Sequence, residues 1–495
     1  MKNYEGRNLT MLTDLYELTM AQSYFDMNRH EKVIFDLFYR KNPFDNGYAI
    51  ACGIDDVVEY VKDLHFSKED VEYLKSLNIF SDGFLNYLSN FKFTGNMFAV
   101  ENGTVVFPME PIVKIEADII EAQIVETALL NIINHQTLIA TKASRVKWAA
   151  GDDNVLEFGL RRAQGPDAGL YGAKAAVIGG CGSTSNVLAG QMFGIKLSGT
   201  HAHSYVMSFD SELEAFRTYV KTFPKAAILL VDTYDTLKSG VPHAIEVFKE
   251  MRENGVLPKK GEGIYGIRLD SGDLSWLSKE SRRMLDEAGF EDAIISASSD
   301  LDEYLIQSLK LQGAKIGLWG VGTNMITAKD CPALGGVYKL AAVEEDGVYI
   351  PKIKLSENPV KVTNPGNKKI IRIVDKTTGL IRADLICLHD EIYDEKDDLT
   401  VFDPIYTWKR KTIKGGTYYI INLHKQYFKD GVQVAEERDV EGAKKHCEES
   451  LAMLSKESRR LVNPHYVHVD LSEKLWALKD NMKNGIHDEI SEESK

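Results

Sequence analysis

Hydrophobic and polar positions near the start of the chain change from a helical to a strand-like spacing. Apolar residues recur at helical spacing in the segment 11–27, which predicts an amphipathic helix. The run at 33–40 (VIFDLFYR) predicts a strand, and 43–53 (PFDNGYAIACG) predicts a turn into another strand. The segment 103–119 (GTVVFPMEPIVKIEADI) has the composition of a β-hairpin broken by prolines. This part of the chain is therefore expected to mix helices and strands.

The pattern becomes repetitive in the middle of the chain. A long helical pattern covers 124–150, and short apolar runs then alternate with helical stretches. The runs are VLEFGLRR, GIKLSGTHAH, AAILLVDTYD, IYGIRLDSGD, AIISASSDLD and AKIGLWGVGT. Continuous apolar runs that alternate with helices are typical of a parallel sheet covered on both faces. Six such units predict a TIM-like (β/α) barrel, complete or irregular.

After Tyr338 the chain becomes β-rich and then helical. The segments 352–375 and 417–426 predict strands, and 440–461 predicts a helix. With 495 residues the chain is too long for one ordinary core, so two or three domains are expected. We predict an N-terminal α/β domain at 1–120, an irregular α/β barrel carrying the active site at 121–345, and a C-terminal β-then-α region at 346–495, partly packed on the N-terminal domain.

Composition and charge narrow the class of protein. The chain is 44% hydrophobic and 27% charged, and no apolar run is long enough to span a bilayer, so no membrane partner is expected. The N-terminus has no signal pattern and the five cysteines form no CxxC motif, which predicts a cytoplasmic protein with free thiols and no zinc site. A net charge of −14 argues against nucleic-acid binding, which needs a basic face. An anionic small substrate would instead need locally placed arginines.

Nearly every apolar run of the central region ends in residues that can do chemistry. These are Arg161 and Arg162, His201 and His203, Asp232 and Asp235, Arg268 and Asp270, Ser298 and Asp300, and Gly322 and Thr323. Because the carboxyl ends of barrel strands converge on one mouth, these residues are predicted to share one site.

Two of the strand ends suit anions. In GVGTNM, Gly322 and Thr323 let the backbone approach a phosphate, although most such turns are merely tight. In IRLDSGD, Arg268 offers a fork for phosphate or carboxylate, beside carboxylates that can hold ribose hydroxyls or Mg²⁺. The alternative for that segment is a helix start with Asp270 or Ser271 as the N-cap, which leaves the arginine unexplained.

The remaining candidates each have a structural alternative. Arg161 and Arg162 are adjacent, so on a strand at most one faces the mouth. His201 and His203 share one face if their segment is a regular strand. No nearby cysteine or glutamate completes a metal site, so a nucleophile or base is favoured, with a core role open for one of them. Tyr16 lies on the first helix, where an aromatic side chain usually packs in the core.

Taken together, these segments resemble nicotinate phosphoribosyltransferases along nearly the whole chain. The matching blocks are LTDLYELTM, NPFDNGYAI, VETALLNIINHQTLIATKA, EFGLRRAQGPDA, STSNVLAG, SGTHAHSYV, VDTYDT, IRLDSGD, WGVGTNM and LGGVYKL. The resemblance implies that nicotinate and 5-phosphoribosyl 1-diphosphate give nicotinate mononucleotide and diphosphate in NAD salvage, with ATP hydrolysed as co-substrate. It also implies an irregular barrel, a homodimer with shared active sites, and Mg²⁺ as cofactor.

The resemblance further implies roles for individual residues. His203, directly after Ala202, is the histidine that ATP phosphorylates, and Tyr16 reaches the neighbouring subunit's site to stack on the pyridine ring. The other implied roles fall to residues at the predicted barrel mouth. Asp232 and Asp270 act on the ribose hydroxyls, Mg²⁺ or the developing positive charge; Gly322 and Thr323 hold the 5-phosphate; Arg268 or Arg161 pairs with the nicotinate carboxylate; Thr200 caps that carboxylate; and Ser271 contacts substrate.

Three other functions stay open at this point. A nicotinamide-specific transferase has a related architecture, but an acidic residue is expected near its ring, where STSNVLAG offers the neutral Ser185 and Asn186. A phosphosugar- or nucleotide-binding sensor on a decayed barrel is disfavoured, because the residues that could do chemistry are intact: Arg268, Asp270, Asp232 and His203. A barrel aldolase is weaker, because no strand end offers a Schiff-base lysine.

Overall fold

The computed structural model describes residues 7–259, 261–358 and 361–493, and the chain divides into two compact units. Unit 1 comprises Met1–Thr141 and Ala333–Lys495, and unit 2 comprises Lys142–Pro332. This division differs from the predicted boundaries at 120 and 345, because strands from both ends of the chain pair in one sheet of unit 1.

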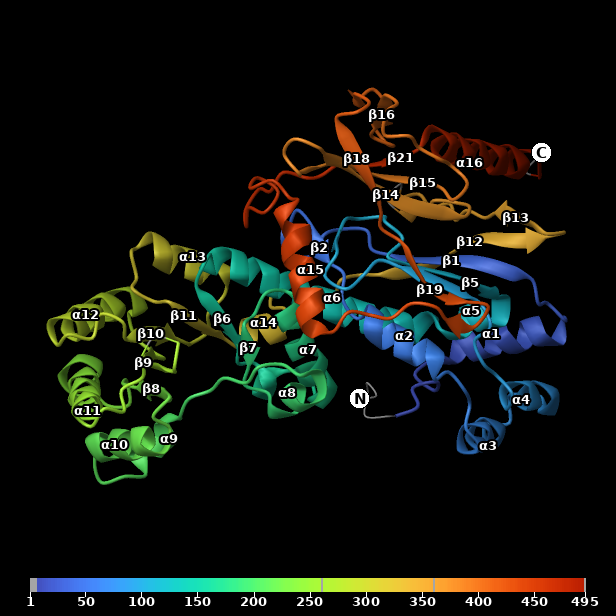
Figure 1. Cartoon of the computed structure of the whole chain (residues 1–495). Helices are drawn as coiled ribbons and strands as arrows, with labels where there is room; N and C mark the ends of the chain where they lie inside the picture. Colours follow the sequence, from blue (N-terminus) through green and yellow to red (C-terminus); the bar gives the residue numbers. More distant parts are fainter. Residues whose placement is uncertain (1–6, 260, 359–360, 494–495) are drawn as a thin grey trace. The chain divides into compact units, whose positions relative to one another are not determined.

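The main sheet of unit 1 is antiparallel and has seven strands in the order β13-β12-β1-β5-β3-β19-β20. The strands are β1 Lys32–Phe38, β3 Asn96–Ala99, β5 Val113–Asp118, β12 Val337–Glu345, β13 Val348–Pro351, β19 Lys425–Lys429 and β20 Val432–Gln433. β1 lies between β5 and β12, so an N-terminal strand joins strands that are distant in sequence (Figure 1). The helices from the N-terminal part are α1 Leu15–Asp26, α2 Ile54–Lys62, α3 Lys68–Ser76, α4 Asp82–Leu88 and α5 Ile119–Ile124, and α6 Glu126–Ala150 continues into unit 2.

Most predicted elements of this region are confirmed, but the hairpin at 103–119 is wrong. The helix at 11–27, the strand at 33–40 and the long helix at 124–150 correspond to α1, β1 and α6. The segment 103–119 supplies two strands that pair elsewhere. β4 Val105–Val106 pairs with β2 Ala49–Ile50, whereas β5 pairs with β1 and β3. Prolines, which cannot donate a ladder hydrogen bond, separate the two strands and end the pairing.

The C-terminal part of unit 1 forms a second sheet, in the order β18-β14-β15-β21. Its strands are β14 Lys368–Asp375, β15 Ile381–Leu388, β18 Tyr418–Asn422 and β21 Val469–Leu471, with a separate pair β16 Leu399–Phe402 and β17 Arg410–Ile413 and the helices α15 Val440–Ala452 and α16 Glu473–Glu493. The predicted helix at 440–461 is confirmed as far as Ala452.

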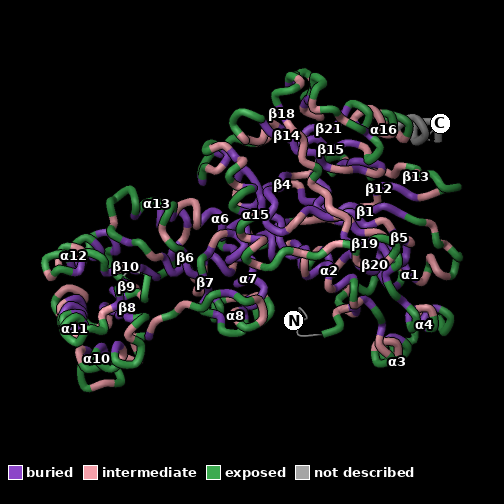
Figure 2. The backbone as a smooth tube through the Cα atoms, in the orientation of Figure 1, coloured by how far each residue is buried: buried purple, intermediate pink, exposed green. Residues whose placement is uncertain are grey.

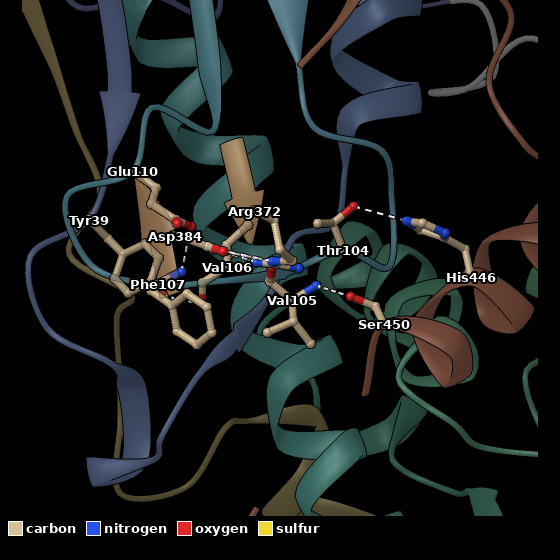
Figure 3. A network of polar contacts seen from close by, with 10 residues as sticks. All are labelled: Tyr39, Thr104, Val105, Val106, Phe107, Glu110, Arg372, Asp384, His446 and Ser450. Atoms are coloured by element: carbon tan, nitrogen blue, oxygen red, sulfur yellow. Dashed lines mark hydrogen bonds and ion pairs between the residues drawn. The ribbon is translucent and has the colours of Figure 1, made fainter. Parts of the chain in front are cut away.

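A buried polar network links this second sheet to the segment after β4 (Figure 3). Arg372 on β14 lies directly opposite Asp384 on β15, and both are fully buried. The guanidinium donates to the Asp384 carboxylate through Nε at 2.9 Å and Nη2 at 2.6 Å, and Nη2 also donates to the Val105 carbonyl at 2.7 Å. Glu110 lies beside the pair and accepts the Phe107 N–H at 2.8 Å. Charged groups therefore contribute to this junction, in addition to apolar contacts such as that of Met109 with the cluster around Ile386.

Unit 2 is built on an open parallel sheet of six strands in the order β7-β6-β11-β10-β9-β8. The strands are β6 Asn154–Glu157, β7 Ser183–Thr184, β8 Ala226–Leu230, β9 Ile264–Leu269, β10 Ile294–Ala297 and β11 Leu318–Val321. The helices α10 Glu212–Thr222, α11 Val241–Glu253, α12 Leu274–Glu287 and α13 Glu303–Leu311 lie outside the strands (Figure 1), and α11 buries one side and exposes the other (Figure 2). The predicted α/β class with an irregular barrel is confirmed, and the sheet is open rather than closed.

One of the six predicted barrel strands is wrong. Five runs contain β6, β8, β9, β10 and β11, but GIKLSGTHAH forms only an isolated bridge from Leu197 to Thr184. Among the described residues no strand extends this bridge to Thr184 into a ladder, and β8 pairs only with β9. In the described parts of the chain no helix is both long and apolar enough to cross a membrane.

Candidate active site

The candidate site lies where β8 and β9 end and is organised by Asp232. Its Oδ2 accepts the N–H of Asp270 at 2.9 Å and the hydroxyl of Ser271 at 2.7 Å. Its Oδ1 is buried and has no hydrogen-bond partner among the described residues. Asp232 therefore fixes the end of β9 with one oxygen and keeps the other for an additional donor or cation.

Arg268, on β9, connects the site to the segment before His203. Its guanidinium donates to the Thr200 hydroxyl and, from Nη2 at 3.1 Å, to the His201 carbonyl. Burial lowers the pKa of Arg268, while the carboxylates of Asp270 and Asp232 act in the opposite direction. The charge is thus held in place by fixed acceptors before any substrate arrives.

His203 is the first residue of the short helix α9, His203–Met207, and not part of a strand. Its Nδ1 lies 3.1 Å from the Thr233 hydroxyl, and its Nε2 lies 3.7 Å from Oδ2 of Asp270. The His203 side chain is 39% exposed, so the ring is oriented but still reachable. The hydroxyl of Ser298 donates to the other oxygen of Asp270. Ser298 was a candidate in the sequence because it follows a predicted strand, whereas no sequence pattern indicated a role for Thr233.

The expectation that His201 and His203 share a strand face is wrong. The residue His201 is 7% exposed, and its Nε2 accepts the N–H of Leu230 at 3.2 Å. Burial lowers the pKa of His201 to about 4, so this ring is neutral at physiological pH. His203 alone presents an accessible ring nitrogen in this segment.

The arginines after β6 do not lie on a strand either. Arg161 and Arg162 end a short 3₁₀ helix, Leu160–Arg162, and both are exposed. The charge of Arg161 makes a small contribution to the lowered pKa of Arg268, after the larger effect of burial. The alternating-face argument therefore does not apply, and Arg161 stays a candidate for binding an anion.

Glu157, at the end of β6, was missed in the sequence. It is fully buried and accepts the Gly159 N–H and the Thr184 hydroxyl, the latter at 2.5 Å. Burial raises its pKa. An acidic residue inside the apolar run VLEFG is the signal that was available. Glu157 holds together the ends of β6 and β7.

Several other candidates have local structural partners. Gly322 and Thr323 follow β11, where a side chain at 322 would come within 3.1 Å of the Phe158 carbonyl. The N-cap of α12 is Asp273, which accepts the Trp276 N–H at 3.0 Å. The alternative in which Asp270 or Ser271 caps this helix is therefore wrong. The carboxylate of Asp235 caps the turn Thr236–Gly240, and Asn186 caps α8, Val187–Phe193.

Tyr16 belongs to unit 1 and is 46% exposed on α1, so the expectation that it packs in the core is wrong. The buried residues of this helix are Glu17, Leu18 and Ala21. Burial of the hydroxyl end and the neighbouring charges of Glu126 and Glu17 raise the pKa of the phenol, which keeps it protonated.

The oxygen donors of the site fit Mg²⁺ better than a softer metal. Among the described residues, no group of three or more His, Cys, Asp or Glu is placed to hold a metal ion. Asp232 contributes a buried unpaired oxygen, and Asp270 lies beside it. Mg²⁺ usually binds one or two carboxylates and completes its shell with water and substrate phosphates.

Comparison with known proteins shows the family to which the chain belongs. The family model of the nicotinate phosphoribosyltransferase N-terminal domain matches residues 11–134, and that of the C-terminal domain matches residues 367–479. The Bacillus subtilis (strain 168) nicotinate phosphoribosyltransferase is 45% identical over 495 residues, 99% of each chain. The chain belongs to the nicotinate phosphoribosyltransferase family. A second family member, from Caenorhabditis elegans, is 35% identical and covers 94% of this chain and 92% of its own.

Solved structures show the same fold. Human nicotinic acid phosphoribosyltransferase aligns with a TM-score of 0.82 and 29% identity, over 95% of this chain and 99% of that one. A nicotinate-nucleotide pyrophosphorylase from Pyrococcus furiosus aligns with a TM-score of 0.67 at 21% identity, over 92% and 98% of the two chains, which shows only a shared fold. The nicotinate phosphoribosyltransferase family consists of enzymes, and the chain is one of them.

Proposed function

We propose that the chain makes nicotinate mononucleotide and diphosphate from nicotinate and 5-phosphoribosyl 1-diphosphate, with hydrolysis of ATP. The observation that carries the proposal is the juxtaposition, at the ends of β8 and β9, of Asp232 with a free oxygen, the half-buried Arg268, and His203 facing Asp270. This set supplies an anion site, a place for ribose hydroxyls or Mg²⁺, and a nucleophile for a phosphoryl group.

The transfer step needs positioning and electrostatics more than proton transfer. A C–N bond forms from the pyridine nitrogen to C1 of the ribose, and the C–O bond to diphosphate breaks, so C1 becomes cationic in the transition state. The pyridine nitrogen is unprotonated at neutral pH, so no general base is required. Asp232 and Asp270 place negative charge beside the reacting sugar, and Arg268 or Arg161 pairs with the nicotinate carboxylate. Mg²⁺, when bound, would neutralise the charge of the departing diphosphate.

The other binding roles follow the same chemistry. Gly322 and Thr323 bring main-chain N–H groups to the 5-phosphate, and the Thr200 hydroxyl, held by Arg268, contacts the nicotinate carboxylate. Ser271 is exposed and bonded to Asp232, which places its hydroxyl at the same strand end. Residues from β9, from the turn after β11 and from the segment before α9 would thus bind the two substrates at one site.

ATP acts, in this proposal, by phosphorylating His203. If Nδ1 donates to the Thr233 hydroxyl, Nε2 keeps its lone pair and can attack the γ-phosphorus of ATP. The N–P bond forms, the bond to the ADP oxygen breaks, and water later releases phosphate. Phosphohistidine adds negative charge and acceptors that can order nearby groups, so ATP hydrolysis biases binding and release rather than the C–N bond formation itself.

Replacing His203 with Ala should abolish the stimulation by ATP and leave slow, ATP-independent transfer. The ring is the only accessible imidazole of its segment, whereas the Asp232 and Arg268 contacts do not involve it. Product formation with and without ATP, together with release of ADP, measures the effect. Full ATP stimulation in His203→Ala would contradict the assignment.

The overall activity is tested by supplying phosphoribosyl diphosphate and Mg²⁺ with nicotinate or nicotinamide, each with and without ATP. Product from nicotinate alone, increased by ATP, is the expected result. Product from nicotinamide would contradict the carboxylate pocket, and binding of phosphoribosyl diphosphate without any product would favour a sensor. We further propose a cytoplasmic homodimer in which the exposed Tyr16 contacts the neighbouring subunit's site, supported by the exposed apolar side chains Leu12 and Leu15 beside it.

A further inference from the structure

His201 takes no part in the chemistry proposed above, yet its side chain is bonded to β8. The N–H of Leu230, the last residue of β8, donates to Nε2 of His201 over 3.2 Å. Because a backbone N–H only donates, Nε2 must carry the lone pair, and the neutral ring has its proton on Nδ1. The contact lies two residues before Asp232, so the imidazole is joined to the strand that delivers the central carboxylate.

The main chain of the same residue holds the other half of the site. The carbonyl of His201 accepts Nη2 of Arg268 at 3.1 Å, and the adjacent Thr200 hydroxyl accepts from Nη1. Two residues further along the chain, His203 begins α9. His201 therefore bonds to β8 through its side chain and to β9 through its carbonyl. It lies in the same segment as Thr200 and His203.

Aromatic packing fixes the orientation of the His201 ring. The rings of Tyr205, Phe216 and Tyr219 surround it, with centroid separations of 5.4, 6.0 and 4.7 Å. Nδ1 is buried and makes no hydrogen bond of standard geometry among the described residues, although a backbone contact with Ala202 acts to raise the pKa of the ring. A buried N–H without a well-formed hydrogen bond is unfavourable, so a phenyl ring would suit this pocket better if packing were the only requirement. The feature that a phenyl ring lacks is the acceptor facing Leu230.

We propose that His201 is a positioning residue for the transferase reaction: as the Nδ1–H tautomer it accepts the Leu230 N–H and thereby sets Thr200, Arg268 and His203 in register with Asp232. The proposal rests on the proposed function for its kinetic consequences, but the tautomer itself does not depend on turnover. It assigns the two histidines of the THAH segment different tasks, His203 the chemistry and His201 the placement.

Two substitutions separate the acceptor from the ring. His201→Phe keeps an aromatic ring of similar size but removes the acceptor, whereas His201→Gln places an amide oxygen at about the reach of Nε2. We expect His201→Phe to lower kcat/KM for transfer by about 10- to 100-fold and to weaken ATP stimulation, because small misplacements of binding groups are costly. His201→Gln should return both to within a few-fold of the wild-type protein.

A matched control comes from His424 in unit 1. It is half-buried, desolvation of its ring lowers its pKa to about 3, and one ring nitrogen bonds a backbone group, the Pro111 carbonyl at 2.6 Å. His424→Phe should lower thermal stability without changing kcat, KM or ATP stimulation. Wild-type kinetics in His201→Phe, or a His201→Gln variant as defective as His201→Phe, would overturn the proposal.

The tautomer provides a readout that needs no activity. In ¹⁵N-histidine NMR spectra of the whole protein at pH 7, the signals that disappear in His201→Gln should show a protonated Nδ1 and an unprotonated Nε2. A charged ring or the opposite tautomer would overturn the proposal even if His201→Phe does not fold. If the wild-type protein forms no mononucleotide, the proposed function fails. The NMR result still decides whether His201 accepts the Leu230 N–H and so positions the segment before α9.

Discussion

Asp232→Asn should lower kcat/KM for nicotinate mononucleotide formation at least about a hundredfold, or about 2.7 kcal/mol of transition-state stabilisation. The carboxylate uses Oδ2 for two donors, the Asp270 N–H and the Ser271 hydroxyl, and keeps Oδ1 unpaired. An asparagine has only one oxygen. If its NH₂ group faces the Asp270 N–H and the Ser271 hydroxyl, a donor meets two donors. If the NH₂ group faces the substrate side, a donor replaces the unpaired acceptor there. In both orientations the negative charge is lost.

Steady-state kinetics with nicotinate, phosphoribosyl diphosphate and ATP measure this effect. Asp235→Asn is the matched control, because that carboxylate caps the turn that follows β8, where it accepts the N–H groups of Leu237 and Lys238. Asparagine is an equally good cap, so the control should stay within a few-fold of the wild-type rate. An Asp232→Asn enzyme that is also within a few-fold would remove Asp232 from the substrate site.

The sequence predicted that several residues of this site, among them Asp232 and Asp270, lie together, but it did not predict the contacts between them. Continuous apolar runs located β8 and β9, and the carboxyl-end rule then brought Asp232, Arg268 and Asp270 to one place. The periodicity of the THAH segment was misleading. A run with alternating polarity can form a strand only if a neighbouring strand offers its free edge, and that long-range condition is not visible in a local pattern.

The same limit explains the division of the chain. The pairing of β1 with β12 joins segments about 300 residues apart, and no local signal encodes that pairing. Glu157 shows the reverse case, since one acid inside an apolar run was visible but its two donors were not. Buried charges are thus easier to detect in a sequence than their partners. The same holds for Arg372, whose partners are not evident from the sequence.

Arg372→Met should lower the free energy of unfolding of unit 1 by about 3–5 kcal/mol at pH 7, because it leaves a fully buried carboxylate without its cation. Asp384 would lose the contacts from Nε and Nη2, and the Val105 carbonyl would lose its donor as well. The change in unfolding free energy is measured by urea unfolding of the whole protein, monitored with a spectroscopic signal that arises from unit 1. Lys414→Met, which removes the cation of the exposed pair with Asp398, is the control and should cost far less than Arg372→Met, because solvent screens this pair. Equal losses in the two variants would contradict the role of the buried pair.

Glu110 makes the stability of this junction depend on pH. Its Oε2 accepts the Phe107 N–H. Its Oε1 is buried and has no hydrogen-bond partner among the described residues, unless this oxygen is protonated and donates to the Asp384 carboxylate. Burial, and then the charge of Asp384, raise the pKa of Glu110 well above its usual range. The folded protein therefore keeps a proton that the unfolded chain releases above a pH of about 4.3, and stability falls as pH rises, until the folded pKa is reached.

Glu110→Gln should remove this pH dependence while keeping the donor, because the amide NH₂ can face Asp384 as the protonated acid does. Relative to the wild-type protein, the variant should gain up to about 1.4 kcal/mol for each pH unit above about 5, with the largest difference on the alkaline side. Unfolding free energies of both proteins from pH 5 to 8 test the sign directly. Parallel pH profiles would show that Glu110 is ionised in the folded state, and the buried Arg372 would then be shared by two carboxylates rather than paired with one.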